Sequence, residues 1–403
     1  MAAVTKNSTQ TAVVLSGGGA RGAYEAGVIA GIVEILRDQR PEHAPFSIFT
    51  GTSVGAINST WLAAHADRPD MNVGGLLEQW RSLELREHLR ISPMRFLWPS
   101  RGGERLGRSL INPRALEDLV QERIPFGRLH DNVDAGIVQA VVVAALNIAS
   151  TKTTMFAEVA PEASFVPSRD PRRLGRLTRI ECGHVLASAA IPLVFPARRI
   201  GSEYYCDGGI RFNTPLAPAI RSGADRLVVV SALHRAELEA DTDPGERLRR
   251  TAAYPSPFFI LGKVLNALLL DPINYDLSVM HRLNRLWGVL EETLTADEMH
   301  RVRAVLDETR GVSYRRLDTL VFHPSQDIGD ITTRHAKRLG AKSLTGVFMA
   351  LSARARAQFE ADLLSFVLFD GDFADELISL GRQDAEDRAD EIIAFFKPGV
   401  RAS

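Results

Sequence analysis

The stretch Thr11–Gly22, which reads TAVVLSGGGARG, decides how the first part of the chain folds. Its first half is a run of apolar and β-branched residues, which is typical of a buried strand. Three glycines end that run. Apolar residues from Tyr24 to Leu36 then recur at roughly the i, i+4, i+8 spacing of a helix with one buried face. The stretch therefore predicts a strand, a glycine turn and a helix in direct succession.

The same succession recurs farther along the chain. Residues 47–50 form a second short strand candidate, and a helix of small residues follows from Val54 to about Ala66. Residues 137–147 and 226–232 are valine-rich runs that suit central strands buried on both faces. Strands that alternate with helices favour an α/β fold with a mainly parallel central sheet covered on both sides.

Composition divides the chain into three parts. The alternating pattern occupies residues 9–233, and we expect one domain there. Residues 234–256 are charged and carry several prolines, which indicates a linker or long loop. Residues 257–403 read as a mostly helical C-terminal region, with a strand candidate at 317–322 and a final helix over about 373–396.

Charge and length exclude several classes of protein. The 403 residues include 48 Lys and Arg against 49 Asp and Glu, so no basic excess points to a nucleic-acid partner. Two cysteines, Cys182 and Cys206, form no C-x-x-C motif, which favours a reducing compartment. The apolar run at the start is too short for a secretory signal. We expect a cytoplasmic protein; peripheral membrane association and a homo-oligomeric state stay open.

One apolar segment has two interpretations. Residues 257–270 are apolar almost throughout but fall short of the roughly 20 residues that a spanning helix needs. They read either as a core helix of the C-terminal region or as a lid or interfacial helix that contacts lipid. The segment that follows is amphipathic, with Arg282 and Arg285 on its basic side, which adds some support to the interfacial interpretation, although the core helix stays the preferred one.

The glycine-rich turn itself matches a nucleotide-binding motif. Residues 17–22 fit G-x-G-x-x-G, the pattern of dinucleotide-binding loops. Such a site needs an acidic residue at the end of the second strand to hold the ribose. That strand ends in Thr50-Gly51-Thr52-Ser53 instead. Nucleotide binding is therefore the weaker interpretation of this motif. The simpler alternative is a glycine turn that only joins the strand to the helix.

A second motif carries a candidate nucleophile. Gly51-Thr52-Ser53-Val54-Gly55 is a G-x-S-x-G sequence placed after a strand and before a helix, the setting of a nucleophile elbow. A serine needs a base to act as a nucleophile. In an α/β-hydrolase several strands would precede the strand that leads into the elbow, whereas here only one strand does, so that fold fits badly.

A third motif offers that base. Asp207-Gly208-Gly209 follows the strand-like residues 204–206 and precedes a helix. An aspartate between a strand end and two glycines is held rigidly and is open to close approach. On its own the motif also fits a plain Asp-Gly turn.

These motifs together resemble those of the patatin-like phospholipases. A fourth block agrees, because residues 187–196 read ASAAIPLVFP, similar to the family's A-S-x-A-x-P-x-x-F-x-P. The resemblance covers about residues 9–233. It implies a three-layer α/β/α fold and a Ser-Asp dyad that hydrolyses acyl esters of lipids through an acyl-enzyme intermediate. The substrate it implies is an acyl lipid at a membrane or micelle surface; phospholipid, lysophospholipid and neutral glyceride stay open.

The resemblance also assigns roles residue by residue. It makes Ser53 the nucleophile and Asp207 the base. It places the remaining residues in the oxyanion hole (Gly17, Gly18, Gly19, Ala20, Arg21 and Gly22), in the nucleophile elbow (Gly51, Thr52, Val54 and Gly55) and beside the base (Gly208 and Gly209). Glycine N–H groups before a helix suit an oxyanion. Arg21 is interpreted as a brace for the loop, or as a contact for a phosphate head group.

Other function classes stay as alternatives. No histidine pair has the spacing of H-E-x-x-H, so we expect no catalytic metal and no cofactor. A Ser-His-Asp esterase or an acyltransferase would need a histidine partner, and none of the ten histidines lies in a recognisable motif. A nucleotide-binding module lacks its acidic ligand. A catalytically inactive lipid-binding or scaffolding protein is less favoured because Ser53 and Asp207 are both present.

Overall fold

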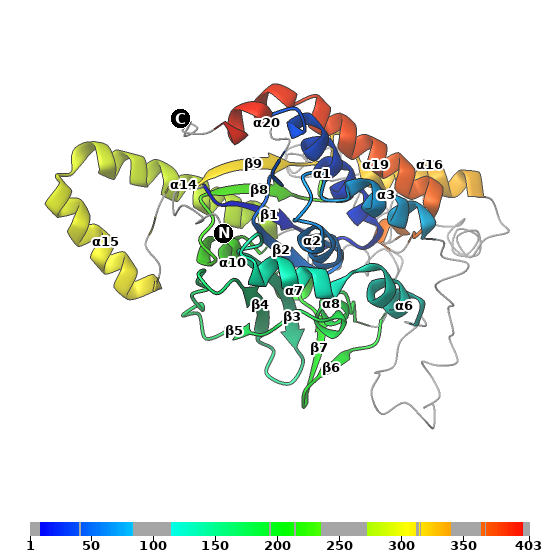
Figure 1. Ribbon diagram of the computed structural model, residues 1–403, viewed down its shortest axis with the longest axis horizontal. Helices are drawn as coiled ribbons and strands as arrows, with labels where there is room; N and C mark the ends of the chain where they lie inside the picture. The colour runs from blue at the N-terminus through cyan, green and yellow to red at the C-terminus, as the bar shows by residue number, and fades with distance from the viewer. Residues whose placement is uncertain are drawn as a thin grey trace, which may run out of the picture.

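The computed structural model describes residues 9–39, 42–83, 114–192, 195–212, 215–234, 272–311, 314, 316–339, 364–366 and 368–397. In this part of the chain nine strands form one sheet, in the order β5-β4-β3-β2-β1-β8-β9, with β7 beside β3 and β6 beside β7 (Figure 1). The strands are β1 (Thr11–Leu15), β2 (Ile48–Thr52), β3 (Ala140–Asn147), β4 (Thr153–Val159), β5 (Arg173–Leu177), β6 (Arg198–Ile200), β7 (Glu203–Asp207), β8 (Arg226–Val230) and β9 (Asp318–Phe322).

Helices cover both faces of this sheet. They are α1 (Gly22–Leu36), α2 (Val54–Ala64), α3 (Val73–Ser82), α6 (Arg114–Arg123), α7 (Phe126–Asp134), α8 (Cys182–Ser188), α9 (Gly209–Phe212), α10 (Leu216–Arg221), α14 (Pro272–Thr293), α15 (Ala296–Arg310), α16 (Ile328–Leu339), α19 (Gly371–Glu386) and α20 (Ala389–Phe396), with a short 3₁₀ turn, η1 (Gly19–Arg21), before α1.

The centre of the sheet is parallel, as the sequence predicts. β1 lies between β2 and β8, and Val13 pairs with Phe49 on one side and Val228 on the other. β3 continues the parallel order beyond β2, and β9 continues it beyond β8. Antiparallel pairing is confined to β3 with β4, β3 with β7, and β6 with β7. The prediction of a mainly parallel α/β sheet is confirmed.

Alternate residues of β1 explain the three layers. Val13 and Leu15 pack into the core formed with α1, α2 and α3, while Ala12 and Val14 pack into the core formed with α10 and α14. All four side chains are fully buried. A strand buried on both faces has no reason to alternate apolar and polar residues. The continuous apolar run of the sequence is the signature of its central place.

The C-terminal part of the chain returns to the same sheet. β9 adds a parallel strand beside β8, and α19 packs along α1 (Figure 1). Close approach of these two helices depends on glycine, since a Cβ on Gly27 would overlap the carbonyl of Ile378. The strand expected at 317–322 is β9. The division into a domain over 9–233 and a separate region over 257–403 stays a prediction.

The final helix is shorter than the sequence suggested. A single helix over about 373–396 was expected, but the structure has α19 and α20 with a break at Asp387 and Arg388. Arg388 leaves helical geometry, with φ −118° and ψ 24°. Its guanidinium donates to the carbonyl of Val321 in β9 and pairs with Glu391. This attachment to the sheet turns the chain, which a helical pattern alone does not reveal.

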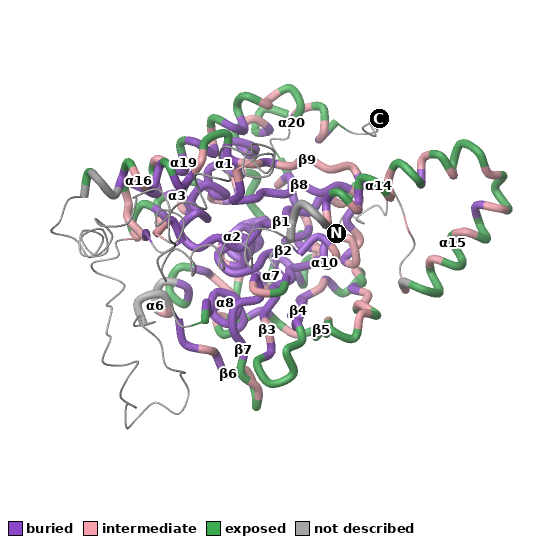
Figure 2. Tube along the Cα trace, turned by 180° about the vertical axis from the view of Figure 1, so that it is seen from behind, coloured by how far each residue is buried: buried purple, intermediate pink, exposed green. Residues whose placement is uncertain are grey.

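The helices α14 and α15 extend away from the body of the molecule (Figures 1 and 2). Only the first half of α14 reaches the core, where Leu277 and Met280 are buried, whereas Leu286 is 56% exposed. The apolar residues 257–270 and the expected linker 234–256, except for its first residue, lie outside the described residues. No helix in the described ranges is both long and apolar enough to cross a bilayer.

Candidate active site

The G-x-S-x-G motif forms a sharp turn between β2 and α2. Ser53 has φ 56° and ψ −127°, a left-handed backbone that a residue with a side chain rarely adopts. The flanking glycines allow the turn to close. A Cβ on Gly51 would overlap the carbonyl of Gly55, and a Cβ on Gly55 would overlap the carbonyl of Leu15. The turn is therefore packed directly on the end of β1, where the glycine loop begins.

Ser188 fixes this turn from the opposite side. Its hydroxyl accepts a hydrogen bond from the Ser53 N–H at 2.9 Å and donates one to the Ala144 carbonyl at 2.6 Å. Ser188 is fully buried at the end of α8. From the sequence, Ser188 was only one residue of the ASAAIPLVFP block, with no role of its own. The bridging role of Ser188 can be recognised only once β3, which carries Ala144, is known to lie beside β2.

Strand register brings Asp207 to Ser53. β2 pairs with β3 as far as Thr52 opposite Ala144. β7 pairs with β3 from the next residue onward, with Asp207 opposite Ala145. β4 pairs with the other edge of β3. β7 therefore pairs with the same edge of β3 as β2, beyond the point where β2 ends. The last residue of β7 and the first residue after β2 thus meet at one point of the sheet.

The carboxyl group of Asp207 is fully buried there. Oδ1 accepts a hydrogen bond from the Gly209 N–H at 2.7 Å. Oδ2 has no partner with full hydrogen-bond geometry, although the Ser53 side chain is close enough to lower the pKa of the carboxyl. Burial outweighs both contacts and raises the pKa of Asp207 to about 7. Gly208 fits closely under this turn, since a Cβ on it would overlap the Ala144 carbonyl.

The glycine loop lies next to Ser53 and is covered by the C-terminal part of the chain. Gly19 has φ 58°, and a Cβ on it would overlap the carbonyl of Phe366. Gly19 and Ser53 line the same pocket. Gly22 at the start of α1 has no room for a side chain either, because a Cβ would press on Val54 and Trp80.

Arg21 braces this cover. It is 2% exposed, and its Nε donates to the Ser365 hydroxyl at 2.8 Å. One terminal nitrogen donates to the Ala232 carbonyl at 3.3 Å, and the guanidinium lies 4.7 Å from the centre of the Phe366 ring. A side chain so enclosed joins the loop to the residues around 365. Of its two expected roles, the geometry favours the brace.

A buried polar network that the sequence did not reveal lies beneath the loop. Glu25 is fully buried and accepts hydrogen bonds from the Ser16 hydroxyl at 3.1 Å and the Asn58 amide at 3.1 Å. Asn58 Oδ1 in turn accepts from the Trp80 indole at 3.0 Å. Burial raises the pKa of Glu25 to about 8. The network links the residue before Gly17 to α2 and α3.

An apolar pocket opens at Ser53. Its walls come from α2, α3 and α6, from the segment after α8, and from Phe369 before α19. The lining residues are Gly19, Ser53, Val54, Ile57, Trp61, Leu76, Gln79, Trp80, Leu83, Val120, Ile124, Ala189, Ile191, Phe195 and Phe369. Apart from Ser53, Gln79 is the polar residue among them. Such a lining suits a hydrocarbon chain much better than a pyrophosphate.

The histidines of the described residues lie elsewhere. None of them lines the pocket or contributes to the pKa of Asp207. His184, on α8, accepts a hydrogen bond from the Glu181 N–H at 3.0 Å and packs on Phe156, and burial lowers its pKa. Across the same residues, no group of three side chains is placed to hold a metal ion.

Comparisons with known proteins identify the family of the chain. No curated protein matches the chain. The crystal structure of VipD from Legionella pneumophila is similar at 15% sequence identity and a TM-score of 0.32, over 93% of this chain and 67% of VipD. A likeness at that score carries no argument about the site. The family model described as "Patatin-like phospholipase" matches residues 13–220, which is more than half of the chain. The chain therefore belongs to the patatin-like phospholipase family.

Proposed function

We propose that this protein hydrolyses carboxylic esters of acyl lipids, with Ser53 as the nucleophile and Asp207 as its only base. One observation carries the proposal. A serine in a strained elbow lines an apolar pocket and lies beside a buried carboxyl group, and the pKa of that carboxyl is raised to about 7. A base with a pKa near the working pH transfers protons most effectively.

The first half of the reaction forms an acyl-enzyme. Ser53 Oγ attacks the ester carbonyl carbon, and its proton passes to Asp207 Oδ2, the oxygen without a full hydrogen-bond partner. Negative charge on the former carbonyl oxygen is stabilised by N–H groups of the loop at Gly17–Gly19. The ester C–O bond then breaks, and the leaving alcohol takes the proton from Asp207.

The second half regenerates the free enzyme. Asp207 accepts a proton from water as the water oxygen attacks the acyl carbon. The bond to Ser53 Oγ breaks, the proton returns to that oxygen, and a fatty acid leaves. No cofactor or metal is needed in any step. We place this reaction at a membrane or micelle surface, where acyl lipids gather, with peripheral attachment of the protein.

A covalent probe and a set of variants test the proposal. We expect a fluorophosphonate to label the peptide that contains Ser53, and Ser53→Ala and Asp207→Asn to lose hydrolysis. Glu158→Gln changes another buried carboxylate, on β4, and serves as the matched control. A label on a different serine, or full activity in Asp207→Asn, would contradict the dyad.

The same assay separates a dyad from a triad. A Ser-His-Asp enzyme loses about 10⁴-fold or more when its histidine is disabled. We expect each of the ten histidines, changed singly to Gln, to leave activity within about tenfold, or about 1.4 kcal/mol of barrier. Product analysis for free fatty acid tests hydrolysis against transfer of the acyl group to another alcohol.

A further inference from the structure

The pocket runs along one face of α2, away from Ser53. Ile57 and Trp61 are four residues apart on α2, so their side chains stack along one side of the helix, and Ser53 directly precedes the first turn. Leu76 and Trp80 of α3 form the facing wall with the same spacing. The part of the pocket that extends along α2 from Ser53 to Trp61 is therefore lined by apolar side chains, and it is called the channel below.

Helix geometry gives the length of this channel. The eight residues from Ser53 to Trp61 advance about 12 Å along the helix axis. A helical side chain leans back over the preceding turn, so the Trp61 indole shortens the free path. An extended alkyl chain advances about 1.25 Å per carbon, given a C–C bond of about 1.52 Å at tetrahedral angles. The path therefore accommodates roughly six to nine carbons.

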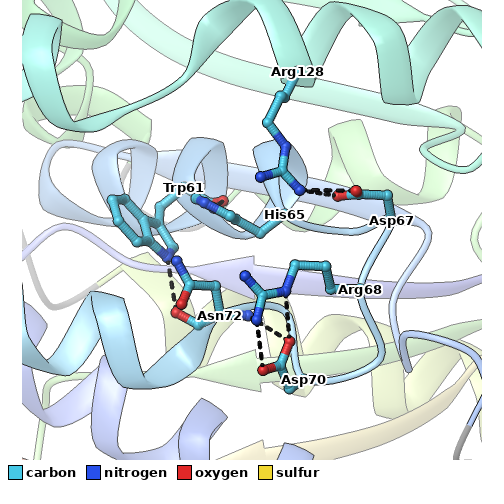
Figure 3. Close-up of polar contacts among 7 residues, drawn as sticks. All are labelled: Trp61, His65, Asp67, Arg68, Asp70, Asn72 and Arg128. Atoms are coloured by element: carbon cyan, nitrogen blue, oxygen red, sulfur yellow. Dashed lines mark hydrogen bonds and ion pairs between the residues drawn. The ribbon is translucent and has the colours of Figure 1, made fainter.

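Trp61 is held firmly in that position (Figure 3). Its indole Nε1 donates to the Asn72 carbonyl at 3.3 Å, and its ring packs on His65 with centroids 4.5 Å apart. Gly75 leaves room for the ring, because a Cβ there would lie 3.0 Å from Trp61 Cζ2. The indole is 6% exposed. It acts as a wall and not as a loose side chain that an acyl chain could push aside.

The turn at residues 68–72, which supports Trp61, is itself held by hydrogen bonds. Asn72 adopts a left-handed backbone with φ 48°. Arg68 bonds both carboxylate oxygens of Asp70, at 3.1 Å each, and Asp70 accepts a further hydrogen bond from the Asn72 N–H (Figure 3). The Asn72 carbonyl, which holds the indole, is thereby fixed relative to the end of α2.

We propose that Trp61 is the end wall of the acyl channel and that it restricts the enzyme to acyl chains of roughly six to nine carbons. This inference rests on the proposed function. It adds the substrate class, esters of medium-chain acids, and assigns Trp61 as the residue that determines chain length.

Two substitutions change the channel in opposite directions. Trp61→Ala removes the end wall and lengthens the path, while Ile57→Phe adds bulk one turn nearer Ser53 and shortens it. The measurement is kcat/KM for 4-nitrophenyl esters of 4 to 16 carbons, each below its aggregation concentration. Ratios of kcat/KM between chain lengths cancel the fraction of folded enzyme. Leu286→Ala, on the exposed part of α14, is the matched control.

The expected results are directional. Wild type should prefer chains of about eight carbons. Trp61→Ala should raise the ratio of the 12-carbon to the 8-carbon ester by about tenfold or more, as one misfitting methylene already costs about tenfold. Ile57→Phe should lower the ratio of the 8-carbon to the 4-carbon ester by a similar factor. Leu286→Ala should leave both ratios unchanged.

The outcomes separate the two proposals. Unchanged ratios in both channel variants, with activity that still depends on Ser53, would overturn the role of Trp61 and leave the proposed function intact. Hydrolysis that persists in Ser53→Ala, or is absent at every chain length, would overturn the proposed function and the chain-length inference with it. If Trp61→Ala does not fold, the ratio in Ile57→Phe decides.

Discussion

Asp207 is the residue whose environment departs most from that of an ordinary aspartate. Full burial opposes ionisation, and the hydrogen bond from the Gly209 N–H and the nearby Ser53 side chain only partly offset that effect. A carboxylate at the surface, with a pKa near 4, would be too weak a base to accept a proton from serine readily. The enclosed position at the end of β7 thus gives this group properties usually supplied by histidine.

The first prediction at this scale is a pH dependence of activity. Only ionised Asp207 can accept the proton of Ser53, and its pKa is about 7. We expect kcat/KM to rise about tenfold per pH unit below about 7 and to level above it. The measurement is kcat/KM for a soluble ester from pH 5 to 9, with folding followed at each pH. A flat profile between pH 5 and 7 would contradict the assignment.

The second prediction concerns stability. The folded protein holds a proton on Asp207 up to about pH 7, whereas the unfolded chain releases it near pH 4. The contribution of Asp207 to the free energy of unfolding should therefore fall as pH rises from about 4 to about 7 and stay constant above pH 7. Asp207→Asn cannot ionise and keeps an oxygen for the Gly209 N–H. We expect the variant to be inactive and, at pH 8, more stable than wild type in urea unfolding.

Comparison at two pH values provides the internal control. At pH 4 both proteins carry a neutral side chain at position 207, so their unfolding free energies should differ least there. An advantage of the variant that is as large at pH 4 as at pH 8 would show that something other than ionisation is responsible.

At the scale of elements, the most consequential pairing is α1 with α19. The two helices approach so closely that glycines of both replace side chains at the contact. A Cβ on Gly27 would overlap the Ile378 carbonyl, and a Cβ on Gly381 would overlap the Tyr24 carbonyl. A hydrogen bond of 2.9 Å from the Tyr24 hydroxyl to Asp384 adds a polar tie. The helix that follows the glycine loop is thus held by a segment near the other end of the chain.

Gly27→Ala tests this contact. An alanine inside a helix normally stabilises by about 1 kcal/mol relative to glycine. At Gly27 the added methyl group must displace α19, and overpacking of this kind costs about 1–3 kcal/mol. We expect a net loss of stability in thermal or urea unfolding. Gly74→Ala, in α3, has nothing within 4 Å of its Cβ and should be neutral or stabilising. Equal effects of the two substitutions would argue against a tight α1–α19 contact.

The sequence predicted those elements whose pattern is contained in one short, continuous stretch of residues. β1, β2, β3 and β8 are continuous buried runs, and the G-x-S-x-G and Asp-Gly-Gly motifs are contiguous, so each could be recognised by itself. β5 and β6, with sequences RLGRL and RRI, lie at the edge of the sheet and carry charges, so they give no such run. The break at Arg388 results from contacts with β9, which no periodicity encodes.

The site followed the same rule. Ser53 and Asp207 could be named from their motifs. Their proximity depends on the strand register, because β2 pairs with the first part of one edge of β3 and β7 pairs with the rest of that edge. The Glu25 network and the walls of the channel join segments far apart in the sequence. Long-range contacts of this kind leave no local pattern, so the sequence could name the candidate residues but not the shape of the pocket.

At the scale of the whole molecule, the sheet is completed by the last third of the chain. β9 pairs with β8 over five residues, and α19 and α20 cover α1. A fragment that ends at residue 234 would expose the edge of β8 and the apolar face of α1 to water. Unpaired edges and exposed apolar faces promote aggregation.

We therefore expect the fragment 9–234 to be insoluble or aggregated although it contains Ser53 and Asp207. Soluble yield and size-exclusion profile, compared with the full chain expressed in parallel, provide the measurement. A monomeric fragment with cooperative unfolding and esterase activity would instead support an independent domain over residues 9–233.

The carbonyl of Phe366 over Gly19 has a consequence for how the enzyme is made. The two residues are about 350 positions apart, so a ribosome that adds about 5–20 residues per second needs roughly 20–70 s to get from one to the other. In the later part of that interval the nascent chain already contains Ser53 and Asp207, but the glycine loop has no cover. The loop therefore reaches its complete folded surroundings only when translation is nearly finished.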